Sequence, residues 1–389
     1  MHLGLISAFC VLVLIGVPVR AGEAVVPFDP TVMPDVSAPI ALMVDVNSGR
    51  VLFERQSHRR FVPASLTKIM TSFVAFELIA AGRLRLDQRV RMSLEAYRQW
   101  HRVGSTMFLA GGSETTVAEL LDGIITVSAN DGCVVLAEGI AGSVPGFTAL
   151  MNAQARKLGL KDTRFNTPNG WMDGGETYTS AADLAVLSTA LITRHPALYR
   201  RFYGRDHLAF RGIDQVNHNP LYGYTAGADG VKTGFTNEAG YGLVGTAIRS
   251  GRRLMIVVGG YDRPKIRALE SRAFVEWGFA AWDAQPLFAA GVRIGQAQVQ
   301  GGAARTVDLV APNPVALALP RGTRARYSLA IRYKGPLKAP IAMGDPVATL
   351  VVRAEGQGEE RVPLVAARAV PQGGLLSRIS DGFVALGGQ

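Results

Sequence analysis

Ser65 and Lys68 form a Ser-x-x-Lys pair at the start of a long apolar segment in this chain of 389 residues. Pro63 precedes the pair and Gly82 follows the apolar segment, so the sequence predicts a helix over 65–81. Residues three apart lie on one face of a helix, with Cβ atoms about 5–6 Å apart. We therefore expect the hydroxyl of Ser65 to meet the amine of Lys68.

The predicted helix is apolar almost all the way round, which indicates that it is buried. Burial and the positive end of the helix dipole both lower the pKa of a lysine in the first turn. A neutral amine beside a hydroxyl is a base beside a nucleophile. Because Ser-x-x-Lys pairs also arise by chance, a solvated first-turn lysine is the alternative, and other parts of the chain have to distinguish the two.

The composition indicates a globular protein large enough for two domains, with 48% hydrophobic and 19% charged residues. The formal net charge is +10, but the lysines and arginines are scattered. This distribution favours a general attraction to anionic surfaces or substrates and predicts no nucleic-acid partner.

Residues 1–21 resemble a secretory signal peptide, with an apolar run over 3–17. An uncleaved membrane anchor is the alternative. The interpretation as a signal predicts export across the cytoplasmic membrane, to a periplasmic or extracytoplasmic location. Cleavage would leave Cys133 as the single cysteine, which excludes an intrachain disulfide. We expect this cysteine to be buried and structural.

The order of predicted elements is typical of an α+β protein, in which one antiparallel sheet has a helical segment between its two halves. Residues 22–37 are predicted to be a leader, and residues 88–110 to be short strands and loops. The expected helices cover 65–81, 116–127, 131–141, 145–158, a segment after Ser180, and 265–280. The expected strands cover 41–46, 50–55, 207–211, 230–236, 241–249 and 252–259. After Trp282 the helical period disappears, and short alternating runs predict a small β-sandwich.

Two further short segments lie at predicted element boundaries. Ser128-Ala129-Asn130 falls in a break between two helices, and Lys232-Thr233-Gly234 lies on a strand before a hairpin. Together with Ser65-x-x-Lys68 they follow the order of the three elements that penicillin-recognising serine enzymes share.

On these segments the chain resembles the low-molecular-mass penicillin-binding proteins, which are serine-type D-Ala-D-Ala carboxypeptidases. The likeness covers about residues 38–370 and includes Leu150-Met151-Asn152 and Asp229-Gly230-Val231. It implies a penicillin-recognising serine transpeptidase/β-lactamase-like fold over 38–282 and a second, β-sandwich domain over 283–371.

The resemblance also implies a role for each residue. Ser65 would attack the carbonyl of the penultimate D-Ala, with Lys68 as its base. Ser128 would pass a proton to the leaving amine, tuned by Lys232. Asn130 would hold Lys68 and the amide of the substrate.

For the terminal carboxylate, the resemblance implies the hydroxyl of Thr233 and the positive charge of Lys232. Gly234 would let the strand approach the substrate closely. The backbone N–H groups of Ser65 and Phe235 would form the oxyanion hole. The implied partners are peptidoglycan peptide stems and β-lactam antibiotics, and no cofactor is implied.

The six histidines are scattered, and the chain has no His-Glu-x-x-His or Cys-x-x-Cys sequence, so we expect no metal site. His195 and His207 are expected on ordinary surface, and His218 is expected to line the cleft.

Residues 372–389 contain a segment that would be amphipathic as a helix, with Leu375, Leu376, Ile379, Phe383 and Leu386 on one face. The resemblance implies a peripheral anchor on the outer face of the cytoplasmic membrane. A frayed tail is the alternative.

Three other functions remain open at this point. A β-lactamase would share the nucleophile but would need an acidic residue for deacylation, for which Asp173 and Glu176 are the candidates. A D,D-endopeptidase would share all three segments. A non-catalytic cell-wall-binding module could retain the fold, although the intact polar residues argue against it.

Overall fold

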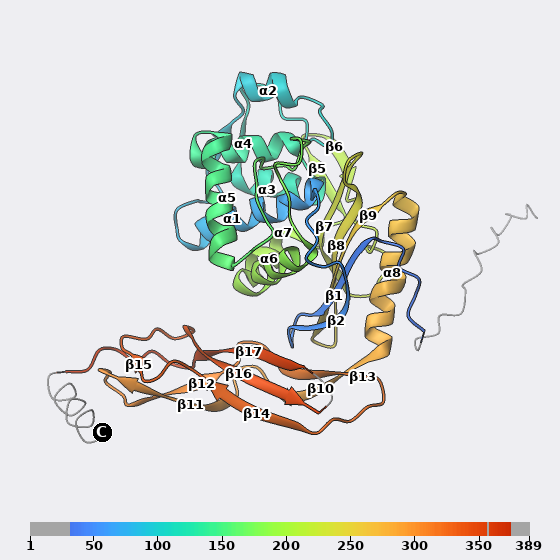
Figure 1. Cartoon of the computed structure of the whole chain (residues 1–389). Coiled ribbons are helices and arrows are strands. Elements are labelled where there is room, and N and C mark those ends of the chain that lie inside the picture. Colours follow the sequence, from blue (N-terminus) through green and yellow to red (C-terminus); the bar gives the residue numbers. More distant parts are fainter. Residues whose placement is uncertain (1–31, 356–357, 375–389) are drawn as a thin grey trace, which may run out of the picture.

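The computed structural model of the chain describes residues 32–355 and 358–374 (Figure 1). The helices are α1 (Lys68–Ala80), α2 (Leu94–Trp100), α3 (Val117–Thr126), α4 (Asn130–Ala141), α5 (Val144–Leu158), α6 (Ala181–Arg194), α7 (Pro196–Phe202) and α8 (Pro264–Ala281), with a 3-10 turn, η1 (Ala64–Thr67), directly before α1. The strands as far as residue 261 are β1 (Ile40–Asp45), β2 (Arg50–Arg55), β3 (Arg89–Arg91), β4 (Glu114–Thr116), β5 (His207–Phe210), β6 (Ile213–Val216), β7 (Ala228–Thr236), β8 (Gly240–Arg249) and β9 (Arg252–Tyr261).

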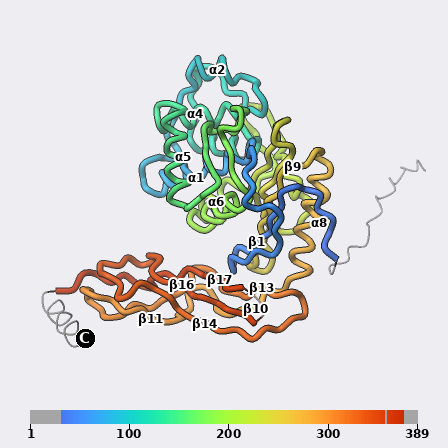
Figure 2. The backbone as a smooth tube through the Cα atoms, in the orientation of Figure 1, coloured from blue at the N-terminus to red at the C-terminus, as the bar shows by residue number. Residues whose placement is uncertain are grey.

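The central sheet is antiparallel and has the order β2-β1-β9-β8-β7. Strand β1 therefore lies between its sequence neighbour β2 and the much later β9. Figure 2 shows the blue segment of β1 and the yellow segment of β9, which are far apart in the sequence but pair in this sheet. Strand β7 is at the edge of this sheet. The arrangement of the sheet and the inserted helices confirms the predicted α+β class.

Alternate residues of the strands enter two different cores, because successive side chains point to opposite faces of a sheet. Leu42 and Val257 pack against the inserted helices, whereas Met43 and Ile256 pack against α8. Helix α8 thus covers one face of the sheet, and the helices α1 to α7 lie on the other side (Figure 1).

Several helix ends follow the sequence signals closely. Thr116 and Glu119 form a complete capping box at the start of α3, and left-handed glycines at 142 and 159 end α4 and α5. The prediction of only strands and loops over 88–110 is wrong, because Ser93 caps the short helix α2 there. A two-turn helix of this kind has too few apolar positions to show a period.

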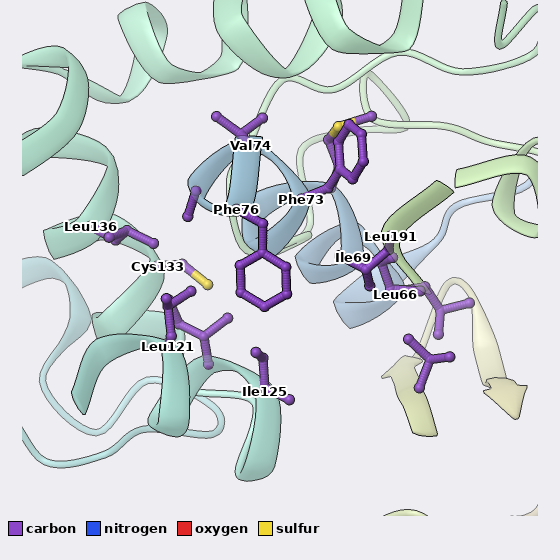
Figure 3. Close-up of a cluster of buried hydrophobic side chains, with 14 of the residues drawn as sticks. Leu66, Ile69, Phe73, Val74, Phe76, Leu121, Ile125, Cys133, Leu136 and Leu191 are labelled. Carbon is purple, nitrogen blue, oxygen red and sulfur yellow. The ribbon is translucent and has the colours of Figure 1, made fainter. Parts of the chain in front are cut away.

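Helix α1 runs through the middle of the larger core. Its residues 68–76 are all buried. Figure 3 shows the ring of Phe76 among Leu121, Ile125 and Cys133 from α3 and α4. Cys133 has no exposed surface, and burial raises the pKa of its thiol to about 12, so the expectation of a buried structural cysteine is confirmed.

The chain after α8 forms only strands, namely β10 (Trp282–Phe288), β11 (Arg293–Gln300), β12 (Thr306–Val310), β13 (Val315–Pro320), β14 (Tyr327–Arg332), β15 (Leu337–Lys338), β16 (Pro346–Ala354) and β17 (Glu359–Ala366). A two-stranded sheet, β10-β13, and a six-stranded sheet, β14-β16-β17-β12-β11-β15, share one apolar core. This β-domain lies below the first part of the chain in Figure 1.

Arg50 connects the two parts. Its Nη1 donates a 2.8 Å hydrogen bond to the carbonyl oxygen of Ala318 and lies 3.5 Å from Oε1 of Glu360. Its guanidinium also lies over the ring of Trp282, 5.1 Å from the centroid.

Among the described residues, no single helix has the length and apolar content needed to cross a bilayer. Helices α4 and α5 meet both criteria only as a pair, and they are bent by 86°.

Candidate active site

Ser65 and Lys68 are brought together at the start of α1, as predicted, but through a tighter turn than expected. Ser65 lies in the 3-10 turn η1, and Lys68 is the first residue of α1. Nζ of Lys68 lies 2.8 Å from Oγ of Ser65. The preceding Ala64 has φ +48°, and the loop that carries Gly170 presses against it, since a Cβ on this glycine would lie 1.8 Å from the Ala64 carbonyl oxygen.

The side chain of Lys68 is almost completely buried, with 1% exposure. Besides Ser65, its Nζ is within 2.8 Å of Oδ1 of Asn130 and 2.6 Å of the carbonyl oxygen of Asn169. Burial lowers the pKa of Lys68 to about 8, against smaller opposing effects of Cys133 and Asp131. A neutral amine is therefore accessible near neutral pH.

Ser128 and Asn130 lie at the junction between α3 and α4. Ser128 has φ +63°, which turns the chain sharply, and its buried Oγ has no hydrogen-bond partner among the described residues. Nδ2 of Asn130 donates to the carbonyl of Val103, and this bond orients the amide so that Oδ1 faces Lys68.

Strand β7 supplies Lys232, Thr233 and Gly234 at the free edge of the sheet. A Cβ on Gly234 would lie 2.8 Å from the carbonyl oxygen of Pro63, so this glycine lets β7 approach the turn that carries Ser65. Nζ of Lys232 is buried and donates to the carbonyl of Thr233 at 3.1 Å. Burial, followed by the charge of Lys68, holds the pKa of Lys232 well below its usual value.

These residues surround a cavity of about 560 Å³. Its lining includes six of the residues expected from the sequence, Ser65, Ser128, Asn130, Thr233, Gly234 and Phe235. Lys68 and Lys232 lie behind this lining, in contact with Ser65 and Thr233 respectively. The structure thus gathers all the expected site residues at one cleft.

Arg267 of α8 also lines the cleft, and the sequence interpretation missed it. Its side chain is buried at 8% exposure, and among the described residues it forms no ion pair. Burial lowers its pKa, yet an arginine remains protonated. A sequence signal did exist, because Arg267 falls on the same helix stripe as the buried Ser271 and Phe274. A charged side chain on a buried stripe of a helix needs a partner for its charge, and the side chain of Arg267 faces the cleft.

Asp173 and Glu176, the two candidate acids for deacylation, lie away from the cleft. Asp173 accepts hydrogen bonds from the backbone and hydroxyl of Thr177, and Glu176 pairs with Arg164 at 3.0 Å. Neither lines the cleft, and the lining residues include no aspartate or glutamate. The described lining of the cleft therefore offers no carboxylate for deacylation.

His195, His207 and His218 lie in three different environments. His218 lines the cleft, as expected. His207 is half exposed beside Asp214. The expectation of surface exposure is wrong for His195, which is buried against Phe73 and accepts or donates a 2.8 Å hydrogen bond with Glu77. Within the described residues, no group of histidine, cysteine and carboxylate side chains has a metal-binding arrangement.

Three features of this site define the class of penicillin-recognising serine enzymes. They are a paired serine and lysine at the start of a buried helix, a second serine and an asparagine at a helix junction, and an edge strand that carries Lys-Thr-Gly. Residues 28–262 match the Peptidase S11 family profile, described as D-alanyl-D-alanine carboxypeptidase. Residues 282–372 match the C-terminal domain of penicillin-binding protein 5. The chain belongs to the D-alanyl-D-alanine carboxypeptidase family and is a hydrolase.

Individual relatives agree with this family. The chain is 34% identical over 366 residues to the D-alanyl-D-alanine carboxypeptidase DacD of Escherichia coli, a match that covers 92% of this chain and 93% of the relative. Penicillin-binding protein 5 of Haemophilus influenzae superposes with a TM-score of 0.71 at 34% identity, covering 87% of this chain and 99% of the other. Penicillin-binding protein D2 of Listeria monocytogenes, in an ampicillin-bound form, superposes with a TM-score of 0.55 at 30% identity, over 63% of this chain and 99% of the other.

Proposed function

We propose that this carboxypeptidase removes the terminal D-Ala from peptidoglycan pentapeptide stems through an acyl-enzyme on Ser65. The observation that carries the proposal is the 2.8 Å contact between Oγ of Ser65 and Nζ of a buried lysine, Lys68, directly behind the lining of the cleft. A buried amine of lowered pKa can accept the proton that the serine must lose to become a nucleophile.

In the first step, Oγ of Ser65 attacks the carbonyl carbon of the penultimate D-Ala while Lys68 takes the hydroxyl proton. The negative charge that develops on the carbonyl oxygen is stabilised by the backbone N–H groups of Ser65 and Phe235. Collapse of the tetrahedral intermediate breaks the peptide bond, and the leaving nitrogen receives a proton from Ser128. Terminal D-Ala leaves, and the stem remains bound to Ser65 as an ester.

Ser128 fits this role because its buried hydroxyl has no partner among the described residues. The proton that Lys68 took from Ser65 replaces the one that Ser128 gave up, and Lys232 tunes this relay through its charge interaction with Lys68. In the second step, water attacks the ester and Ser65 recovers its hydrogen. The stem leaves as a shortened acid.

We assign the terminal carboxylate to Thr233 and Arg267. Arg267 offers a permanent positive charge and lines the same cleft as Thr233, whereas burial lowers the pKa of Lys232 and so weakens its hold on a proton. This differs from the sequence interpretation, in which Lys232 supplied the charge. Asn130 remains available to hold Lys68 and the substrate amide.

β-Lactams would acylate Ser65 by the same route, since their strained amide stands in for the scissile peptide bond and they carry a carboxylate. The ampicillin-bound relative supports this part of the proposal. The absence of aspartate and glutamate from the described lining of the cleft favours slow deacylation over β-lactamase activity.

We further propose that the protein acts outside the cytoplasmic membrane. Residues 1–21, read as a signal peptide, and residues 375–389, read as part of an amphipathic anchor, lie outside the described residues. The domain division near residue 283 is also a proposal, in which the β-domain positions the first domain. It is supported by the cleft, whose described lining comes entirely from residues up to Arg267.

The test is covalent labelling with a fluorescent penicillin, together with release of D-Ala from a pentapeptide. Ser65→Ala should abolish both while the thermal unfolding temperature stays close to that of the wild type. Ser328→Ala, an exposed change on β14, is the matched control and should keep both activities. Labelling of folded Ser65→Ala above background would reject the proposal.

A further inference from the structure

Hydrogen bonds alone do not fix the guanidinium of Arg267. Its Nη1 donates to the carbonyl of Gly242 across a long 3.4 Å, and its Nε is buried with no acceptor among the described residues. A planar group with one weak hydrogen bond can rotate about its last side-chain bonds. Something else must keep it facing the cleft.

Two aromatic rings supply the missing support. The guanidinium carbon of Arg267 lies 5.7 Å from the ring centroid of Tyr241, within the range of a cation–π contact. The ring of Tyr241 stacks on that of Phe235, with centroids 4.1 Å apart and an interplanar angle of 22°. These two residues face each other directly across the β7–β8 ladder. Phe235, Tyr241 and Arg267 thus form a continuous stack from β7 to α8.

We infer that Tyr241 and Phe235 are positioning residues, which hold Arg267 in the orientation that receives the terminal carboxylate of the substrate. The inference rests on the proposed role of Arg267. Phe235 also follows Gly234 directly and contributes its backbone N–H to the proposed oxyanion hole. The stack therefore joins the group that recognises the carboxylate to the strand that stabilises the oxyanion, and an ordered guanidinium loses less conformational entropy when the substrate binds.

The inference predicts a selective loss of carboxylate recognition. The experiment measures kcat/KM for a peptide ending in D-Ala-D-Ala and for the same peptide with a C-terminal carboxamide, which lacks the negative charge. In Tyr241→Leu, the preference for the acid over the carboxamide should fall by about 3- to 30-fold, mainly through KM, because a cation–π contact is worth that much. Tyr241→Phe keeps the ring and should keep the preference.

Controls separate this inference from the proposed function. Tyr327→Leu removes an exposed tyrosine on β14 and should leave both substrates unaffected. Arg267→Gln should abolish the preference; if it leaves the ratio unchanged, the assignment of the carboxylate to Arg267 is wrong. If Arg267→Gln abolishes the preference but Tyr241→Leu retains it, the positioning role is overturned.

Turnover of the carboxamide shows whether each variant folds. Should Tyr241→Leu fail this check, Phe235→Leu and Phe235→Tyr make the same comparison at the more exposed end of the stack, where 46% of the residue is accessible. An unchanged ratio in folded Phe235→Leu would then reject the role of the stack.

Discussion

The carbonyl oxygen of Asn169 lies 2.6 Å from Nζ of Lys68. With Oδ1 of Asn130 at 2.8 Å, it gives the lysine two neighbours that can only accept hydrogen bonds. A protonated amine has three hydrogens and a neutral amine has two hydrogens and a lone pair. In either state the two oxygens accept hydrogen bonds from two hydrogens of the amine. Deprotonation of Lys68 therefore changes only its hydrogen bond with Ser65. In the neutral state the hydroxyl of Ser65 becomes the donor, and the site is ready for proton transfer.

This arrangement predicts that acylation depends on the neutral form of Lys68. The rate of penicillin labelling should rise with pH and level off above an apparent pKa of about 8, the lowered pKa of Lys68. The sign follows because the amine is a base only above its pKa. Rapid-mixing labelling between pH 6 and 9.5 measures the profile, and a flat profile would contradict the role of Lys68.

Lys68→Arg tests the same residue by substitution. A guanidinium does not release its proton, so labelling should slow by about 10²–10⁴-fold, the usual contribution of a general base. Lys338→Arg on the exposed strand β15 is the matched control and should label normally.

Gly234→Ala should slow acylation by about tenfold or more, a loss that corresponds to the 1–3 kcal/mol typical of overpacking. The added methyl group would meet the carbonyl of Pro63 and the backbone nitrogen of Leu66, which cannot move aside cheaply, so β7 must shift away from Ser65. Gly358→Ala, where nothing lies within 4 Å, is the control. Equal labelling rates in both variants would show that the close approach of β7 is unnecessary.

Glu360 should make stability depend on pH at the domain junction. Burial raises its pKa to about 7, partly offset by Arg50. The folded chain then holds this proton more tightly than the unfolded chain, whose glutamates titrate near 4.5, so stability is lost as pH rises from about 4.5 to 7. Glu360→Gln should reduce the decrease in unfolding temperature between pH 5 and 8. Glu355→Gln, an exposed change, should behave as the wild type does. Equal decreases in all three proteins would contradict the prediction.

The β-domain should be dispensable for acylation itself. A chain shortened to end at Trp282 should still bind penicillin covalently, because no described residue that lines the cleft follows Arg267 in the sequence. Circular dichroism establishes whether the shortened chain folds. Loss of labelling in a folded shortened chain would mean that the β-domain shapes the cleft.

The C-terminal tail should give weak binding to anionic membranes. Removal of residues 1–21 takes away one arginine, leaving 40 − 31 = +9, so attraction to anionic lipid adds to the few apolar side chains of the tail. Co-sedimentation with anionic liposomes compares the full chain with one ending at Gln372, at low and high salt. Equal pelleting of the two would exclude the anchor.

Features of the structure that arise from local sequence signals can be predicted from the sequence. Thr116 and Glu119 could be recognised because a capping box is contained within four residues. The burial of His195 was predicted wrongly and the position of Arg267 at the cleft was missed, since the contacts come from other segments of the chain, namely Glu77 in α1 and Gly242 in β8. The three short catalytic segments were found because their residue types are tied to the chemistry. These segments alone do not show that they line one cleft, because the central sheet brings them together.

The order of strands in the central sheet has a consequence for biosynthesis. Asp45 in β1 pairs with Arg252 at the start of β9, 207 residues later. Contacts of such high sequence separation form slowly, whereas the helices between them can form from local contacts as the chain emerges. The helical segment that carries Ser65 and Lys68 can therefore form early. Strand β7 cannot pack beside Ser65 until β8 and β9 have paired with β1. A nascent chain that stops before Tyr261 carries the serine and its lysine without the strand edge that presents a substrate to them, so reactivity towards peptides and β-lactams is acquired only when this first domain is complete.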